Sequence, residues 1–162
     1  MPLSRLGYNA DRIATIAEAM FDDGEPHVST KPSDDRWSSK EILGHLIDSA
    51  TVNLRRFLKA QCQDELVFET YDHERWVHIQ HYNDSDWEEL VTLWASLNMH
   101  LCHVVTMISD EQLDKPRAEH NLGEICYRDF PEGTPATLSY LIEDYFTHLE
   151  HHMRQIMGDL PD

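Results

Sequence analysis

The sequence predicts an all-α protein, a bundle of four long helices, and three observations support this fold class. Apolar residues recur at spacings of three and four along four segments, as they do on one face of a helix. Two of these segments begin with a capping signature. No set of alternating segments suggests strands. The chain has 162 residues, of which 41% are hydrophobic and 27% charged. These values predict a single domain over residues 1–162.

The first two helices are expected at about 9–21 and 38–60. The apolar face of the first consists of Ile13, Ile16, Ala17 and Met20. The second begins with a capping box, in which the Ser38 hydroxyl and the Glu41 carboxylate each satisfy a free backbone N–H. Trp37 directly precedes it and is placed to pack against its start. Gly44 costs about 1 kcal/mol of helix propensity relative to Ala, which suggests that another helix approaches closely there.

Residues 62–83 form a long irregular segment between the second and third helices. Such a length inside one domain indicates either a functional loop or a crossover. A crossover of this length allows the helices on either side to run parallel. Tyr71, Trp76 and Tyr82 lie in this segment, where they either wall a substrate pocket or simply pack against the bundle.

The third helix is expected to begin at a second capping box, Ser85-x-x-Glu88, and to reach about Ile108. Trp87 and Trp94 are expected in its core-facing stripe. Residues 109–113 add a turn at most.

A linker over 116–132 follows, with a short hairpin expected near Gly123. Thr134 is the expected N-cap of the last helix, and Pro135 then occupies its first position, where the missing N–H costs nothing. This helix runs to about Met157, and Gly158 ends it.

The composition excludes several classes of partner. The formal net charge of −17 argues against nucleic acid and against anionic membrane surfaces, because both bind Lys and Arg. No stretch approaches the roughly 18 apolar residues of a membrane span. The N-terminus lacks the apolar run of a signal peptide. Three separated cysteines without a CxxC pair favour free thiols over a disulfide framework or a cysteine zinc site. We therefore expect a cytoplasmic protein.

Three of the 11 histidines lie within residues 148–152 of the last helix. His148 and His152 lie at i and i+4 on the core-facing flank of the last helix, whereas His151 faces solvent. Two imidazoles one turn apart on one face can form half of a metal site. The same spacing also arises by chance as two partly buried side chains. A metal site therefore needs a third ligand from another helix.

His45 is the main candidate for that third ligand, because it lies inside an otherwise apolar helix. It is well away from the main apolar stripe of this helix and would have to face sideways, toward a neighbouring helix. His100 on the third helix is a weaker candidate. The remaining candidates are expected to be solvated surface residues: His27, His103 and His120.

Three motifs together resemble the DinB/YfiT-like superfamily of metalloenzymes, over about residues 8–157. Residues 37–48, WSSKEILGHLID, are similar to the start of that superfamily's second helix. Residues 148–156, HLEHHMRQI, resemble its C-terminal HxxHHxxQI signature. Residues 71–76, YDHERW, are similar to a segment of its YfiT-type branch.

The resemblance implies a four-helix bundle of crossed connectivity and a divalent metal, usually zinc or nickel. It implies three ligands, matched position by position to His45, His148 and His152, whereas His151 matches a position that is not a ligand. Relatives with known activity include thiol transferases that use bacillithiol or mycothiol and a mycothiol-dependent maleylpyruvate isomerase. Others are described as metal-dependent hydrolases.

Three neutral histidines leave one coordination position open, as in catalytic sites. That position suits either an acidified water or a thiolate. The resemblance thus implies a thiol-dependent S-transferase that acts on small electrophiles and uses a low-molecular-weight thiol. A metal-dependent hydrolase and a non-enzymatic, stress-related metal-binding protein are the alternatives, and a homodimer is compatible with each. The sequence does not select a catalytic base among Glu41, Asp48, Asp144 and Glu150, although Asp48 is close enough to orient His45.

Overall fold

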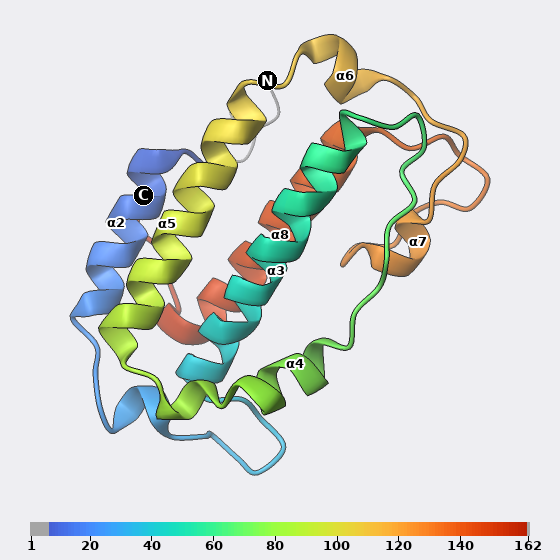
Figure 1. The fold of residues 1–162 in the computed structure, drawn as a ribbon. Helices are drawn as coiled ribbons and strands as arrows, with labels where there is room; N and C mark the ends of the chain where they lie inside the picture. Colours follow the sequence, from blue (N-terminus) through green and yellow to red (C-terminus); the bar gives the residue numbers. More distant parts are fainter. Residues whose placement is uncertain (1–6, 162) are drawn as a thin grey trace.

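A computed structural model describes residues 7–161, in which four helices lie side by side and form a bundle (Figure 1). They are α2 (Ala10–Phe21), α3 (Ser39–Ala60), α5 (Trp87–Thr106) and α8 (Leu138–Met157). α3 packs against both α5 and α8, and α2 packs against α5. Strand-like pairing over residues 7–161 is limited to isolated bridges. The predicted all-α four-helix bundle is confirmed.

The start of α3 is fixed by the predicted capping box. The Ser38 hydroxyl accepts a hydrogen bond from the Glu41 N–H at 3.2 Å, and the Glu41 carboxylate accepts one from the Ser38 N–H at 2.9 Å. Trp37 is partly buried against the core, as expected. Because the backbone N–H groups of Ser38 and Glu41 both have hydrogen-bond partners, the start of α3 is fixed only a few residues before His45.

The segment between α3 and α5 is a crossover, as predicted. It contains α4 (His73–Gln80) and the 3₁₀ turn η2 (Tyr82–Asp84). The chain leaves one end of α3 and returns to the other end of the bundle before α5 begins, so α3 and α5 run parallel (Figure 1). α8 runs antiparallel to α3 beside it. The first half of α3 therefore lies next to the second half of α8.

The close approach expected at Gly44 is made by a side chain of the crossover. A Cβ atom at Gly44 would lie 2.1 Å from Cδ2 of Tyr82. Tyr82 is buried against α3, so its role is packing and not the wall of a pocket. Trp87 and Trp94 are buried in the core, as predicted.

Two predicted helix starts are wrong. α5 begins one residue later than Ser85-x-x-Glu88 predicts, with Asp86 as the N-cap accepting from the Glu89 N–H at 3.0 Å. Ser85 instead closes η2 with its N–H, and its carbonyl accepts from the Lys40 ammonium at 2.6 Å.

The last helix begins at Leu138 with Thr137 as its N-cap, not at Thr134 and Pro135. The backbone of Ala136 exchanges two hydrogen bonds with Arg117, at 2.8 and 2.9 Å, which hold it extended. A helix cannot begin before that pairing ends. The Thr134 hydroxyl donates to the Pro131 carbonyl in a turn.

The expected hairpin near Gly123 is also wrong, because these residues form the short helix α7 (Leu122–Ile125). Two further short elements complete the fold, η1 (His27–Ser29) and α6 (Asp110–Asp114). Within residues 7–161, no helix combines the length and the apolar character needed to span a bilayer.

Candidate metal centre

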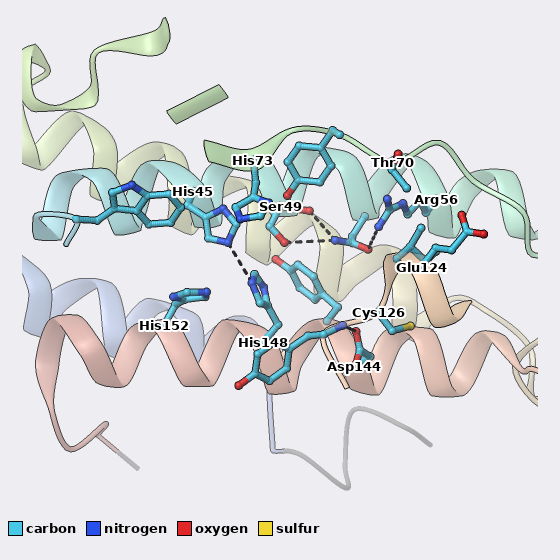
Figure 2. Close-up of a pocket in the computed structure, with 16 residues that line it drawn as sticks. His45, Ser49, Arg56, Thr70, His73, Glu124, Cys126, Asp144, His148 and His152 are labelled. Atoms are coloured by element: carbon cyan, nitrogen blue, oxygen red, sulfur yellow. Dashed lines mark hydrogen bonds between the residues drawn. The ribbon is translucent and has the colours of Figure 1, made fainter. Parts of the chain in front are cut away.

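Three histidines from two helices meet between α3 and α8 (Figure 2). Each of His45, His148 and His152 offers one ring nitrogen, and these nitrogens lie within 4.8 Å of one another. The Nε2 atoms of His45 and His148 are 3.1 Å apart. The antiparallel packing of α3 and α8 brings together residues that are far apart in the sequence. His45 faces sideways toward the neighbouring helix, as the helical wheel requires.

The histidines of the last helix face two different sides, as the sequence indicates. His148 and His152 are half-buried and turned toward α3, and their ring centroids are 4.6 Å apart. His151 is exposed and lies against the ring of Tyr127. The i and i+4 spacing therefore places two imidazoles on one side of α8 and excludes the third.

Burial keeps the imidazoles neutral. Desolvation, reinforced by the neighbouring histidines, lowers the pKa of His45 to about 2 and that of His148 to about 3. The pKa of His152 is lowered mainly by burial, although its hydrogen bond to Gln155 opposes this. Neutral imidazoles expose a nitrogen lone pair, which is the form that binds a metal. The donor set thus fits a divalent cation.

Two further features of the rings bear on that fit. Nδ1 of His45 is buried and has no hydrogen-bond partner. Nδ1 of His152 lies 2.7 Å from Oε1 of Gln155, which accepts its proton and leaves Nε2 free to act as a ligand. Gln155 was not singled out from the sequence as a residue of the site, although it belongs to the C-terminal motif.

Asp48 does not orient His45, contrary to the sequence-based expectation. Its carboxylate accepts from the Gln80 amide and from the Tyr82 hydroxyl, each at 2.8 Å. Burial raises the pKa of Asp48, and these two hydrogen bonds partly offset the increase. Asp48 therefore anchors the crossover to α3.

The other acidic candidates are also engaged elsewhere. The Asp144 carboxylate accepts from the backbone N–H groups of Tyr127 and Arg128, at 2.9 and 2.8 Å. Glu150 pairs with Arg154 on the surface of α8. Glu41 closes the capping box and also pairs with Lys31. None of the four acidic residues considered as a general base is free for that role in this arrangement.

The histidine cluster borders two cavities. The first cavity, of about 360 Å³, extends from the histidines along α3 and α8. Tyr71 lines it, which agrees with one of the two expectations, that this residue walls a pocket. Trp76 lies outside it and packs against Tyr71. The second, of about 680 Å³, lies toward the 27–37 loop. Trp37, His73 and His152 line both cavities.

His73 is the histidine that sequence reasoning missed. It begins α4, and its ring centroid is 5.5 Å from that of His45. It is exposed and lies outside the mutually close set of three. Its place in the 71–76 motif was the available signal. His27 is exposed and lines the second cavity. His100 and His103 are exposed on α5, and His120 bonds to the Thr134 carbonyl.

The fold and the site define a helical bundle with a three-histidine cluster in an accessible cavity. The family model of the DinB superfamily matches residues 11–156, and the chain therefore belongs to the DinB superfamily. No curated protein matches the chain significantly. Among solved structures, the chain is similar to YfiT from Bacillus subtilis, described as a probable metal-dependent hydrolase with an unusual four-helix bundle topology. That likeness has a TM-score of 0.72 at 18% identity and covers 92% of this chain and 79% of YfiT.

Proposed function

We propose that this protein is a metal-dependent enzyme that holds one divalent cation, zinc or nickel, with His45, His148 and His152. The observation that supports this most strongly is the convergence of three neutral imidazole nitrogens within 4.8 Å. Imidazole is a good ligand for both metals. Three protein ligands would leave one coordination position open, as catalytic zinc sites require.

A cation in this cage would supply a polarising charge, which acidifies a bound water or holds a thiol as its thiolate. The protein's own residues do the rest. Gln155 fixes the tautomer of His152, and Trp37 covers His45 with its ring 5.2 Å away. The half-buried Tyr71 and the exposed Tyr127 form walls of the first cavity.

The reaction we propose is thiol-dependent S-transfer to a small electrophile. Such a reaction needs room for two reactants beside one centre, and His152 borders two separate cavities. A low-molecular-weight thiol would occupy one and the electrophile the other. In the step itself, the thiolate sulfur forms a bond to an electrophilic carbon, and the leaving group departs with the electron pair of the broken bond.

Hydrolysis is the second candidate, because YfiT is described as a probable metal-dependent hydrolase. The engagement of Asp48 and Asp144 by other partners favours the transferase, since neither is free to activate a water. The two reactions would use the same three histidine ligands. The transferase also needs a thiol, whereas the hydrolase needs a group that activates water.

An assay with and without thiol separates these candidates. Zinc-loaded protein is mixed with 1-chloro-2,4-dinitrobenzene and a low-molecular-weight thiol, and chloride release and thioether formation are followed. We expect turnover that requires both the thiol and His148. Hydrolysis of aryl esters without thiol, together with no thioether formation, would contradict the transferase and support the hydrolase.

A further inference from the structure

The cavity beside the histidines contains one cationic side chain, Arg56, at the end remote from the cluster (Figure 2). His45 and Arg56 lie on the same face of α3, about three turns or 16 Å apart along its axis. Arg56 is only 6% exposed, and it is the only Lys or Arg among the residues that line this cavity.

The guanidinium of Arg56 is incompletely paired. One terminal nitrogen donates to the Glu69 carbonyl at 2.9 Å, and the other lies 3.5 Å from the Asn53 amide oxygen. Nε is buried and has no hydrogen-bond partner. The ion pairs found among the described residues do not include Arg56. A buried cation without an anion is costly, so an anion in the cavity would be bound favourably.

The acidic residues that share the cavity do not fill this role. Burial lowers the pKa of Arg56, and the charge of Asp144 only partly opposes this. The Asp144 carboxylate is itself held by the N–H groups of Tyr127 and Arg128. Glu124 is exposed on α7 and takes part in none of the ion pairs found among the described residues. Arg117 is also buried and incompletely paired, yet it lines neither cavity. Of these two buried arginines, only Arg56 faces the first cavity.

We propose that the cavity takes a small molecule bearing a carboxylate, which the Arg56 guanidinium binds while the reacting end lies at the histidines. A guanidinium fork matches a carboxylate well, and a single cation balances a single negative charge. This assignment rests on the proposed function for what happens at the histidine end. It names the substrate class of that site: an elongated monocarboxylate, with its charge remote from the reacting atom.

Paired thiols that differ in charge alone test the proposal. Isothermal titration calorimetry on the zinc-loaded, full-length protein compares 6-mercaptohexanoate with 6-mercaptohexanol. We expect the acid to bind about tenfold more tightly, the advantage of one charge-assisted hydrogen-bonded pair. Equal affinities in the wild type would overturn the proposal, whatever the variants do.

Variants locate the charge that is responsible. Arg56→Gln should abolish the preference for the acid and leave the affinity for the alcohol unchanged, and Arg56→Lys should retain part of the preference if Gln destabilises the fold. Arg55→Gln is the matched control, because Arg55 is exposed, adjacent and absent from this cavity. Glu124→Gln should preserve or strengthen acid binding. A preference for the acid that survives in folded Arg56→Gln would overturn the proposal.

A thiol-free measurement separates this proposal from the proposed function. In the metal-free protein, hexanoate should shift the NMR signal of the Arg56 Nε–H, and 1-hexanol should not. If the thiols bind no better than hexanoate while this shift appears, the metal assignment fails and the carboxylate site stands. No shift with hexanoate overturns the carboxylate site. A stronger response to monohexyl phosphate would replace the carboxylate with a phosphate.

Discussion

At the scale of single residues, the histidine site depends on a small set of contacts that hold the crossover against α3. The absent side chain of Gly44 admits the Tyr82 ring, and the Tyr82 hydroxyl donates to Asp48 one turn further along. Gln80 donates to the same carboxylate. These contacts fix α4, and with it His73, beside the cluster. Gly44 lowers the helix propensity of α3, but it leaves the space that the Tyr82 ring occupies.

Gly44→Ala should therefore destabilise the protein, although alanine is the better helix former. The new Cβ would overlap a buried aromatic ring that has little room to move, and overpacking of this kind costs about 2 kcal/mol. Urea unfolding measures the change. Gly123→Ala is the control, because nothing lies within 4 Å of its added Cβ, and it should be neutral or slightly stabilising. A Gly44→Ala variant as stable as wild type would contradict this account of the packing.

Cys126 should make the protein sensitive to alkaline pH. Burial, with the adjacent Asp144, raises the pKa of its thiol to about 12, above the usual value of 9.0. Between these values the unfolded state loses a proton that the folded state keeps, so the free energy of unfolding falls as pH rises through this range. Urea unfolding at pH 8 and pH 10 should show a smaller loss in Cys126→Ala than in wild type. An equal loss in both would contradict the assignment.

At the scale of elements, the two sides of the cavity are anchored by different means. α3 is anchored by its capping box, whereas the 126–128 segment is held to α8 by Asp144. Residues 126–128 are not part of a helix, so the Asp144 carboxylate accepts the N–H hydrogen bonds that a helix would otherwise satisfy internally. The position of Tyr127, which contacts both His148 and His151, follows from it.

Asp144→Asn should loosen this segment without unfolding the bundle. An amide offers one acceptor oxygen in place of two and no negative charge, so we expect a loss of about 1.5–3 kcal/mol. Hydrogen exchange of the Tyr127 and Arg128 N–H groups should accelerate, while amides inside α3 remain protected. Glu132→Gln, an exposed substitution in the same connection, is the control. Unchanged exchange at both amides would show that Asp144 does not anchor the segment.

Sequence patterns predicted the elements better than their ends. The α3 capping box was predictable because its two hydrogen bonds join Ser38 and Glu41 within one turn. Further contacts of Ser38 with Asn83 and of Glu41 with Lys31 leave both hydrogen bonds in place. The start of α8 was not, because the distant Arg117 keeps Ala136 extended and thereby selects Thr137 over Thr134. At α5, adjacent Ser85 and Asp86 were both acceptable caps, and Lys40 engages the first.

The same division applies to the site. His148 and His152 could be predicted from their spacing, and His45 emerged as the main third candidate from its place in an apolar helix. His73 and Arg56 could not, since their relevance depends on how the crossover lies over α3 and on which buried groups lack partners. The 71–76 motif marked the segment that contains His73, but it did not show that this side chain lies beside His45.

At the scale of the whole molecule, connectivity creates the site. The long crossover makes α3 and α5 parallel, and the connection through α6 and α7 brings α8 back antiparallel to α3 (Figure 1). Residues from the first half of one helix and the second half of the other thereby meet at one level of the bundle. Membership of the DinB superfamily and the likeness to the YfiT fold agree with this arrangement. The net charge of −17 favours cations generally, whereas selective binding would come from the three imidazoles.

The most direct test of this account is the metal content of the purified protein and of four single variants, measured by inductively coupled plasma mass spectrometry. We expect about one zinc or nickel per chain in the wild type and in His73→Ala. His45→Ala, His148→Ala and His152→Ala should lose most of it while circular dichroism shows an intact helical fold. Bound metal that is unchanged in both His148→Ala and His152→Ala would contradict the three-histidine centre.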